Sequence, residues 1–447
     1  MSAASDPATI DDAAAEVARI CADLIRIESV NYGDGSGPGE RKAAEYVMGQ
    51  LTEVGLDPVI VESAPGRASV MVRVEGADPA LPGLAVHGHL DVVPANAADW
   101  QVDPFAAEEK DGCIWGRGAV DMKDMDAMII ANLRQLARSG EKPSRTTTFV
   151  FFADEEAGGD HGSHWVVDHH PEWFEGVTEA VSEVGGFSVT VPRAGTGEPT
   201  RAYLLQTTEK GIAWLRLHAR GRAGHGSVPN DANAVVRLAA AIARIAAHPW
   251  PREYIASVTA LLDGLSELTG TPYAPEDPSP VLRHLGGAAG FVLGTLSDTA
   301  AFTMLDAGYK MNVIPGSASA SLDCRFLPGH EDDLMATIRE LAGEHVEVEV
   351  EHRDIALDAP LTGDLVTAMT RSLLVADPDA TVLPYALSGG TDNKALSRLG
   401  ITGYGFAPLR LPPDLDFAPM FHGVDERVPL ESLEFGTRVL GHFLRTA

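Results

Sequence analysis

The sequence predicts an α/β protein in which a core domain, with helices on both faces of its sheet, is interrupted by an inserted two-layer α+β domain. Three observations predict this arrangement. Strand-like and helix-like segments alternate through the first 208 residues, as they do in α/β sheets. Residues 209–353 follow the order strand–helix–strand–strand–helix–strand, which is typical of a small two-layer module with one sheet face free. The alternating pattern then returns in residues 354–447.

The first part of the core domain opens with two helical patterns. Residues 11–28 place Ala, Val, Ile and Leu at helical spacing behind an acidic first turn, and residues 40–55 repeat the pattern and end at a glycine. A third, strongly amphipathic helix is expected at 121–141. Strands are expected from the apolar runs at 69–76, 83–90 and 147–154.

The inserted domain is predicted from a change of pattern near residue 209. Residues 210–221 alternate apolar and polar side chains, as a half-exposed antiparallel strand does. After a helix at 231–248 comes a Pro- and Gly-rich insertion at about 250–300. The remaining elements are expected as strands at 308–314, 317–326 and 346–352 and a helix at 330–344. The second part of the core domain is expected to contain the apolar segment 381–390 and a last helix at 430–446.

Composition limits the functional classes. The 447 residues, of which 45% are hydrophobic, suffice for two or three domains with their own cores. A net charge of −30 and a pI near 4.7 argue against nucleic acid and anionic membranes as partners. No segment approaches the roughly 18–20 apolar residues of a membrane span, and the N-terminus lacks the pattern of a secretory signal. Three scattered cysteines, an odd number, are typical of a reduced intracellular chain. We therefore expect a soluble, cytoplasmic protein.

The segment "FVFFADEEAGG" (149–159) is the first chemical signal, because an apolar strand ends on two adjacent glutamates. Helix capping could explain one of these carboxylates, but two at the end of a buried strand favour a positive partner such as a metal ion. Consecutive residues point in different directions. One of Glu155 and Glu156 could therefore ligate a metal while the other stays free as a proton acceptor.

Other metal-binding side chains stand at comparable positions. His89 and Asp91 are two residues apart at a strand end, so they face the same side; either could be a ligand with the other orienting it, or the two could be a structural pair. Asp121 could cap a helix or present its carboxylate at the mouth of the sheet. Glu183 in "SEVGG" and His422 in "PMFHGVDERVP" complete the set. These nitrogen and oxygen donors suit Zn²⁺, Co²⁺ or Mn²⁺, and five ligands with one bridging suit two metals about 3.5–4 Å apart.

The remaining histidines of the first part have simpler interpretations. His87 is expected to be structural. Four more follow the paired glutamates in a polar, Trp-containing segment that is expected to be a solvated surface helix and turn: His161, His164, His169 and His170.

Taken together and in order, the motifs "GHLDVVP", "GRGAVDMKD", "ADEEAGG", "SEVGG", "GRAGHGSVP", "MNVIPG", "SGGTDNKAL" and "FHGVDERVP" resemble one family. It is the family of dinuclear zinc amidohydrolases and peptidases that includes acetylornithine deacetylase, succinyl-diaminopimelate desuccinylase, aminoacylase, glutamate carboxypeptidase and carboxypeptidase S. The resemblance runs from about residue 15 to the C-terminus. It implies a mixed-sheet catalytic domain in two parts, 1–208 and 354–447, with a ferredoxin-like lid/dimerisation domain at 209–353 and hence a homodimer.

The resemblance also implies a role for each metal ligand. His89 and Glu183 would hold one zinc ion, Glu156 and His422 would hold the other, and Asp121 would bridge the two.

The other implied roles are catalytic or substrate-binding. Glu155 would be the general base, and Asp91 would orient His89. His225 would stabilise the oxyanion from the partner subunit of the dimer. The implied substrate-binding residues are Asn312, Arg325, Gly389, Gly390 and Thr391. For Arg325, which would grip a substrate carboxylate, a surface ion pair is the alternative.

The implied activity is hydrolysis of an N-acyl amino acid or short peptide with a free C-terminal carboxylate, because "TTEKGIAWLRL" (207–217) most resembles the carboxypeptidase S and N-acyl-amino-acid hydrolase branch. A biosynthetic deacylase of the acetylornithine or succinyl-diaminopimelate type is the alternative. A non-catalytic binding protein of the same fold would need a lost ligand or base, yet all of these residues are present.

Two departures from the family pattern are visible. Asp124 stands where the family usually has glycine, so the turn after Asp121 is expected to be braced differently. The insertion at about 250–300 matches no motif and is expected to line or cover the acyl side of the pocket.

Overall fold

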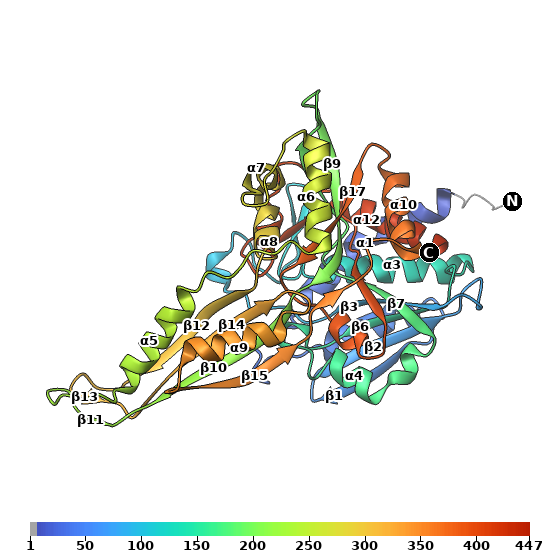
Figure 1. The fold of residues 1–447 in the computed structure, drawn as a ribbon. Helices are drawn as coiled ribbons and strands as arrows, with labels where there is room; N and C mark the ends of the chain where they lie inside the picture. Colours follow the sequence, from blue (N-terminus) through green and yellow to red (C-terminus); the bar gives the residue numbers. More distant parts are fainter. Residues whose placement is uncertain (1–6) are drawn as a thin grey trace.

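A computed structural model describes residues 7–447, so the first six residues of the predicted first part lie outside the described chain. Two sheets organise the molecule (Figure 1): a ten-stranded mixed sheet and a four-stranded sheet that extends away from it. None of the described helices is long and apolar enough to cross a membrane. All three cysteines are free thiols, and two of them are buried.

The large sheet is mixed, as predicted. Its strand order is β1-β2-β6-β3-β7-β18-β9-β16, with β17 and β8 also paired to β9. The central pairs β3–β6, β3–β7 and β7–β18 are parallel, whereas β1–β2 and β2–β6 are antiparallel. The bounds are β1 (Val59–Ala64), β2 (Arg67–Val74), β3 (Gly83–His89), β6 (Thr147–Phe152), β7 (Val177–Ser182), β8 (Phe187–Pro192), β9 (Pro199–Glu209), β16 (Leu357–Asp358), β17 (Thr381–Leu387) and β18 (Thr402–Gly405).

Helices cover both faces of this sheet, which explains why its strands β3 and β6 are buried at every position. On β3, Leu84 and Val86 belong to one hydrophobic core and Ala85 to another on the opposite face. The first core is closed by α1 (Pro7–Arg26), α2 (Arg41–Thr52), α3 (Lys123–Ser139) and α12 (Leu430–Thr446). The second is closed by α4 (Ser163–His169) and α11 (Asn393–Ser397). Helix α10 (Asp364–Ala376) packs on α12. The predicted α/β fold class is confirmed.

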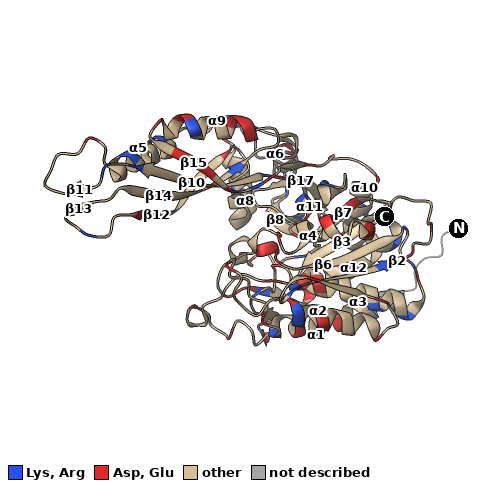
Figure 2. Cartoon of the chain, turned by 90° about the horizontal axis from the view of Figure 1, so that it is seen from below, with Lys and Arg blue, Asp and Glu red and all other residues tan. Residues whose placement is uncertain are grey.

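The small sheet is antiparallel, with the order β12-β14-β10-β15. Its strands are β10 (Gly211–Arg220), β12 (Thr299–Ala307), β14 (Ser317–Phe326) and β15 (Val346–Asp354). Along β10, buried and half-buried side chains alternate, and the buried face packs on α5 (Ala234–Ala246) and α9 (Glu331–Ala342). Figure 2 shows both helices on one side of this sheet, and none of the helices of residues 7–447 packs on its other face.

One predicted strand of the small sheet is wrong. Residues 308–314 are mostly loop, and only β13 (Val313–Ile314) pairs there, with β11 (Gly224–His225). The sheet instead takes its edge strand, β12, from the residues just before. Gly308 has a φ of +78°, which ends the extended run of β12. Because β12 lies at the edge and is largely exposed, its weak apolar pattern did not identify it.

The insertion at about 250–300 packs on the large sheet. It contains α6 (Ala256–Thr269), α7 (Ser279–Leu282) and α8 (Ala289–Leu293). Leu261 and Leu265 of α6 share the hydrophobic core of Leu383 on β17. A Cβ on Gly264 would come within 2.4 Å of the Leu383 side chain, so the helix and strand are in close contact. The apolar face of α6 is thus buried against β17 of the large sheet.

Short elements complete the chain. A three-stranded sheet joins β4 (Glu108–Lys110), β5 (Cys113–Trp115) and β19 (Arg427–Pro429), in the order β19-β5-β4. It brings the segment before the last helix beside the loop that precedes α3. Short 3-10 helices lie at Ala97–Asp99, Glu155–Ala157, Pro171–Phe174, Arg283–Ala288 and Ala418–Met420.

Candidate metal centre

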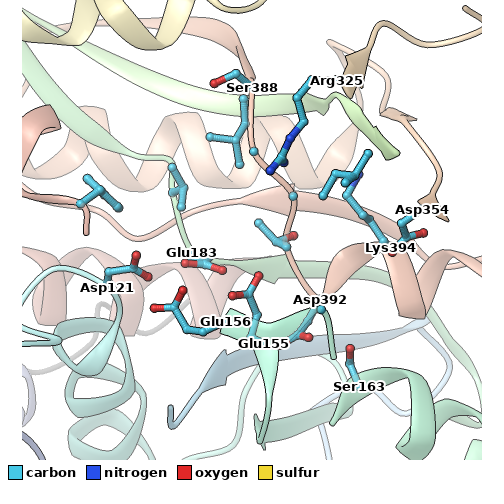
Figure 3. A pocket seen from close by; sticks show the side chains of 18 of the residues that line it. Asp121, Glu155, Glu156, Ser163, Glu183, Arg325, Asp354, Ser388, Asp392 and Lys394 are labelled. Atoms are coloured by element: carbon cyan, nitrogen blue, oxygen red, sulfur yellow. The ribbon is translucent and has the colours of Figure 1, made fainter. Parts of the chain in front are cut away.

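The predicted ligands meet because three of them follow neighbouring strand ends. Strand β3 lies between β6 and β7 and is parallel to both. His89 is the last residue of β3, the paired glutamates follow β6, and Glu183 follows β7 directly. In a sheet with parallel strands the carboxyl ends share one edge, where ligands bind. Figure 3 shows the carboxylates of Asp121, Glu155, Glu156 and Glu183 converging at this edge.

Asp121 presents one carboxylate oxygen to each half of the centre. His89 Nε2 lies 3.2 Å from Asp121 Oδ1 and 3.5 Å from Glu183 Oε2. His422 Nε2 lies 3.2 Å from Asp121 Oδ2 and 3.0 Å from Glu156 Oε2. The structure therefore brings together all five predicted ligands, in the two groupings that the resemblance implies.

The donor geometry fits metal binding. Zinc bonds of about 2.0–2.2 Å in a tetrahedron place ligand atoms about 3.3–3.6 Å apart, close to the separations found here. One oxygen of Glu156, Oε1, is buried and has no hydrogen-bond partner among the described residues. Donor atoms within 4.8 Å of one another form two overlapping groups, His89–Asp121–Glu156 and His89–Glu155–Glu183. The second group includes the predicted base, so the geometry alone also permits Glu155 as a ligand.

The electrostatics of the site favour a cation. Burial raises the pKa of Glu183 to about 8, and burial followed by the charge of Glu183 raises that of Glu155. Burial would also raise the pKa of Asp121, but hydrogen bonds to His422 and His89 outweigh it and lower this pKa. The same contacts to Asp121 and Glu156 raise the pKa of His422 to about 10. Carboxylates gathered in a buried site repel one another, and a bound cation would remove that cost.

Asp91 orients the two glutamates more directly than it orients His89. Its carboxylate accepts the backbone N–H groups of Glu155 and Glu156, each at 3.1 Å, and the side-chain amide of Asn31 at 2.9 Å. His89 Nδ1 lies 3.0 Å from the backbone carbonyl oxygen of Asp91 and 3.6 Å from its carboxylate. Asp91 therefore joins the end of β3 to the turn after β6.

Glu426 is a positioning residue that the sequence analysis missed. Its fully buried carboxylate accepts the backbone N–H groups of Gly118 at 3.0 Å, Val120 at 2.7 Å and Asp121 at 3.2 Å, and pairs with Arg117 Nη1 at 2.7 Å. Because His422 lies four residues earlier in the chain, Glu426 connects the segments of two predicted ligands, Asp121 and His422. A glutamate near two valines in "GVDERVP" was the only local indication that Glu426 is buried. Its hydrogen-bond partners could not be predicted, because they lie more than 300 positions away in the sequence.

We expect Glu426→Gln to weaken metal binding about 10–100-fold, the range for removing a partner that orients a ligand. The glutamine amide N–H₂ cannot accept the backbone donors that the carboxylate now binds, so the loop of Asp121 should loosen. A competition titration with a chelating dye measures the affinity. Excess metal should restore part of the activity, and the exposed Glu431→Gln is the matched control. Unchanged metal affinity in a folded variant would show that the contact is structural only.

A cavity of about 340 Å³ opens above the centre. Its lining includes the four carboxylates and His422, and also Arg325, Gly389, Gly390 and Thr391, which the sequence analysis expected to bind substrate. Arg325 also donates through Nε and Nη2 to the Asp323 carboxylate, at 2.7 and 3.1 Å. The ion pair considered for Arg325 is therefore present, and the guanidinium nevertheless faces the cavity (Figure 3).

His225 and Asn312 lie elsewhere. His225 is exposed on β11, and Asn312 directly precedes β13, at the tip of the small sheet (Figure 1). The His225 ring contacts Ser227 Oγ at 2.8 Å and is absent from the cavity lining within the described chain. A single chain therefore does not bring these two predicted residues to the metal centre.

The structure also shows the environments of His164 and His87. The prediction of a solvated surface position is wrong for His164, which lines the cavity with its Nε2 3.2 Å from Asp354 Oδ2. That hydrogen bond raises the pKa of His164. The tertiary contact between α4 and the end of β15 is the cause, and nothing near His164 in the sequence indicates it. His87 is buried and contacts Asn393 Oδ1 at 2.9 Å, as expected of a structural histidine.

Comparisons with known proteins cover most of the chain. The sequence profile of the peptidase family M20/M25/M40 matches residues 85–446. An N-fatty-acyl-amino acid synthase/hydrolase from Xenopus tropicalis is 28% identical over 430 residues, which are 92% of this chain and 81% of that protein. Human aminoacylase-1 is 27% identical over 416 residues, 90% of each chain. A metallo-carboxypeptidase structure from Sulfolobus solfataricus superposes with a TM-score of 0.72 at 16% identity, covering 96% of this chain and 99% of the other.

Proposed function

Because this chain belongs to the peptidase family M20/M25/M40, we propose that its metal centre hydrolyses the amide bond of an N-acyl amino acid or of a short peptide with a free C-terminal carboxylate. Family membership, together with its N-fatty-acyl-amino acid hydrolase and aminoacylase relatives, makes the chain a metal-dependent amide hydrolase. The observation that carries the narrower proposal is the position of Arg325, whose guanidinium faces the same cavity as Asp121 and Glu155.

The centre would hold two zinc ions. His89 and Glu183 would bind one, Glu156 and His422 would bind the other, and Asp121 would bridge them through the two oxygens that face the two histidines. Co²⁺ and Mn²⁺ accept the same donors. When bound, such ions lower the pKa of a coordinated water and polarise the substrate carbonyl.

Glu155 would act as the general base and acid. Its carboxylate faces the cavity, and Asp91 fixes its backbone N–H. Burial raises the pKa of Glu155, which suits a group that first accepts a proton from the attacking water and then donates it to the leaving nitrogen. The proton would be held on a Glu155 carboxylate oxygen between these two steps.

The leaving amino acid would be held by its carboxylate. Two of the Arg325 nitrogens already donate to Asp323, which fixes the plane of the guanidinium and leaves Nη1 for the substrate. Gly389, Gly390 and Thr391 line the same cavity. Holding both ends of the scissile bond in place would supply much of the rate enhancement.

We expect wild-type enzyme to cleave an N-acyl amino acid faster than its C-terminal amide, and Arg325→Ala to remove the difference. A hydrogen bond to a charged group contributes about 1.5–3 kcal/mol, so kcat/KM for the free acid should fall about 10–100-fold. The rate on the amide should change little. Arg353→Ala, an exposed arginine on the same small sheet, is the control. Equal losses on both substrates would contradict the role of Arg325.

A panel of N-acyl amino acids and dipeptides, assayed with added zinc, cobalt and manganese, tests the proposed activity itself. The proposal fails if none is cleaved. A biosynthetic deacylase is the second candidate; it would cleave acetylornithine or succinyl-diaminopimelate and show little activity on N-acyl amino acids with apolar side chains.

We also propose that the chain is a homodimer built through the small sheet, which, together with most of residues 209–353, would serve as the lid/dimerisation domain. The edge strand β12 and the loop after it expose Met304, Leu305, Tyr309 and Met311, and an unpaired edge favours pairing with a second copy. His225 would then reach the metal centre of the other subunit and stabilise the oxyanion, with Asn312 beside it. Sedimentation gives the oligomeric state. Mixed dimers of His225→Ala and Glu155→Ala subunits should recover part of the activity; their failure to do so would contradict a shared site.

A further inference from the structure

The cavity has an aromatic wall made of one residue from the motif "FHGVDERVP" and one from the insertion at about 250–300, which matches no motif. Phe291, from α8 of the 250–300 insertion, and Phe421, directly before His422, both line the cavity. Their ring centroids are 5.6 Å apart and their planes are nearly perpendicular, at 81°. Edge-to-face packing of this kind stabilises the pair beyond the area that it buries. We refer to Phe291 and Phe421 as the aromatic wall.

The aromatic wall is fixed from behind. Phe421 packs on Phe417 at 5.2 Å, and Phe417 on Phe187 at 5.2 Å, so a row of rings connects the wall to the core of the large sheet. On the other side, the buried Lys210 Nζ donates to the carbonyl oxygens of Gly294 at 3.0 Å and Ser297 at 2.7 Å. These contacts hold the C-terminal end of α8, and with it Phe291.

The wall begins beside the proposed metal ligands, at Phe421. Phe421 is adjacent to His422, which contacts Asp121 and Glu156. Figure 3 shows these two carboxylates on one flank and Arg325, Lys394 and Asp354 toward the other.

The part of the cavity near Arg325 is also lined by apolar residues, which belong to the small sheet. Ile212 on β10 is the strand partner of Arg325 on β14, and Trp214 is two residues further along. Both line the cavity. The amino-acid half of a substrate held at Arg325 would therefore contact Ile212 and Trp214, which leaves the aromatic wall for the other half.

We propose that the aromatic wall is the acyl-binding site and that Phe291 makes the enzyme prefer a large apolar acyl group over acetyl. The inference rests on the proposed function, because it takes the carboxylate of the amino acid to lie at Arg325. An acetyl group would leave most of two phenyl rings uncovered, whereas a longer or aromatic acyl chain would bury them. Each buried methylene raises kcat/KM about fourfold.

The test is the ratio of kcat/KM for the N-hexanoyl and N-acetyl forms of one amino acid. We expect a wild-type ratio above about 10. Phe291→Ala should lower that ratio about tenfold, and Phe291→Leu, which keeps an apolar side chain, should give an intermediate value. Leu293→Ala on the same helix is the control, since Leu293 is 52% exposed and is not among the lining residues.

A second series separates the two halves of the substrate by varying the amino-acid side chain under a constant acetyl group. The inference is overturned if Phe291→Ala changes this second preference and leaves the acyl preference as it was, or if wild type shows no acyl preference while still cleaving N-acetyl amino acids. If wild type cleaves no N-acyl amino acid, the proposed function falls and this inference falls with it.

Discussion

Glu155→Gln is expected to lower kcat by about 10²–10⁴, the contribution of a positioned general base, while the metal content stays that of the wild type. The glutamine side chain has nearly the same shape but cannot accept the proton of the attacking water. The Asp91 carboxylate should still accept the hydrogen bond from the backbone N–H of residue 155, because the substitution leaves that N–H in place. Steady-state kinetics and metal analysis of the same preparation measure both quantities.

The metal analysis makes this prediction decisive, because Glu155 also belongs to a group of possible ligands with His89 and Glu183. If Glu155→Gln loses metal in proportion to activity, Glu155 is a ligand rather than the base. If it keeps both metal and wild-type rates, the base is another group. Glu175→Gln, at an exposed glutamate just before β7, serves as the control.

Asp121→Asn is expected to weaken metal binding by about 10²–10⁴ and to lower activity in parallel. Asp121 alone places an oxygen beside each of His89 and His422, at 3.2 Å in both cases. Breaking such a buried ionic contact costs about 3–5 kcal/mol, and the neutral amide offers one weaker oxygen donor in place of two charged ones. Equilibrium dialysis followed by metal analysis measures the change in affinity.

The thermal stability of Asp121→Asn gives a second, independent result. Without metal, the variant should be less stable than wild type, because the neutral amide loses the contacts to His422 and His89 that lower the Asp121 pKa in the folded chain. With excess metal, wild type should gain more stability than the variant, since only binding to the folded chain stabilises it. Asp57→Asn, an exposed aspartate, should behave as wild type in both conditions. Equal metal-induced stabilisation of Asp121→Asn and wild type would contradict a bridging role.

Glu155 and Asp121, the subjects of these two predictions, are positioned by different buried carboxylates. The site is therefore built from several segments of the chain. Asp91 fixes the turn that carries Glu155 and Glu156. Glu426 fixes the loop that carries Asp121. Both partners are fully buried carboxylates that accept backbone N–H groups, and Glu426 is also paired with Arg117.

Several features could be predicted from the sequence because their causes are local. An apolar strand that ends on charged residues places them at the sheet edge whatever the rest of the chain does, and this holds for His89, Glu155, Glu156 and Glu183. Amphipathic spacing located α3, α5, α9 and α12 to within a few residues. The edge strand β12 was missed because its exposed side chains lack a strong alternation.

The sequence by itself therefore predicted the fold class and the five side chains that the structure brings together. Apolar strands that end on charged residues are properties of short segments, and the family resemblance supplied Asp121 and His422. Only the tertiary structure decided that α6 packs on the large sheet, that Glu426 braces Asp121 and that Phe291 faces the cavity. It also showed that one chain leaves His225 far from the centre. These features depend on contacts between residues that are distant in the sequence, and no short pattern encodes them.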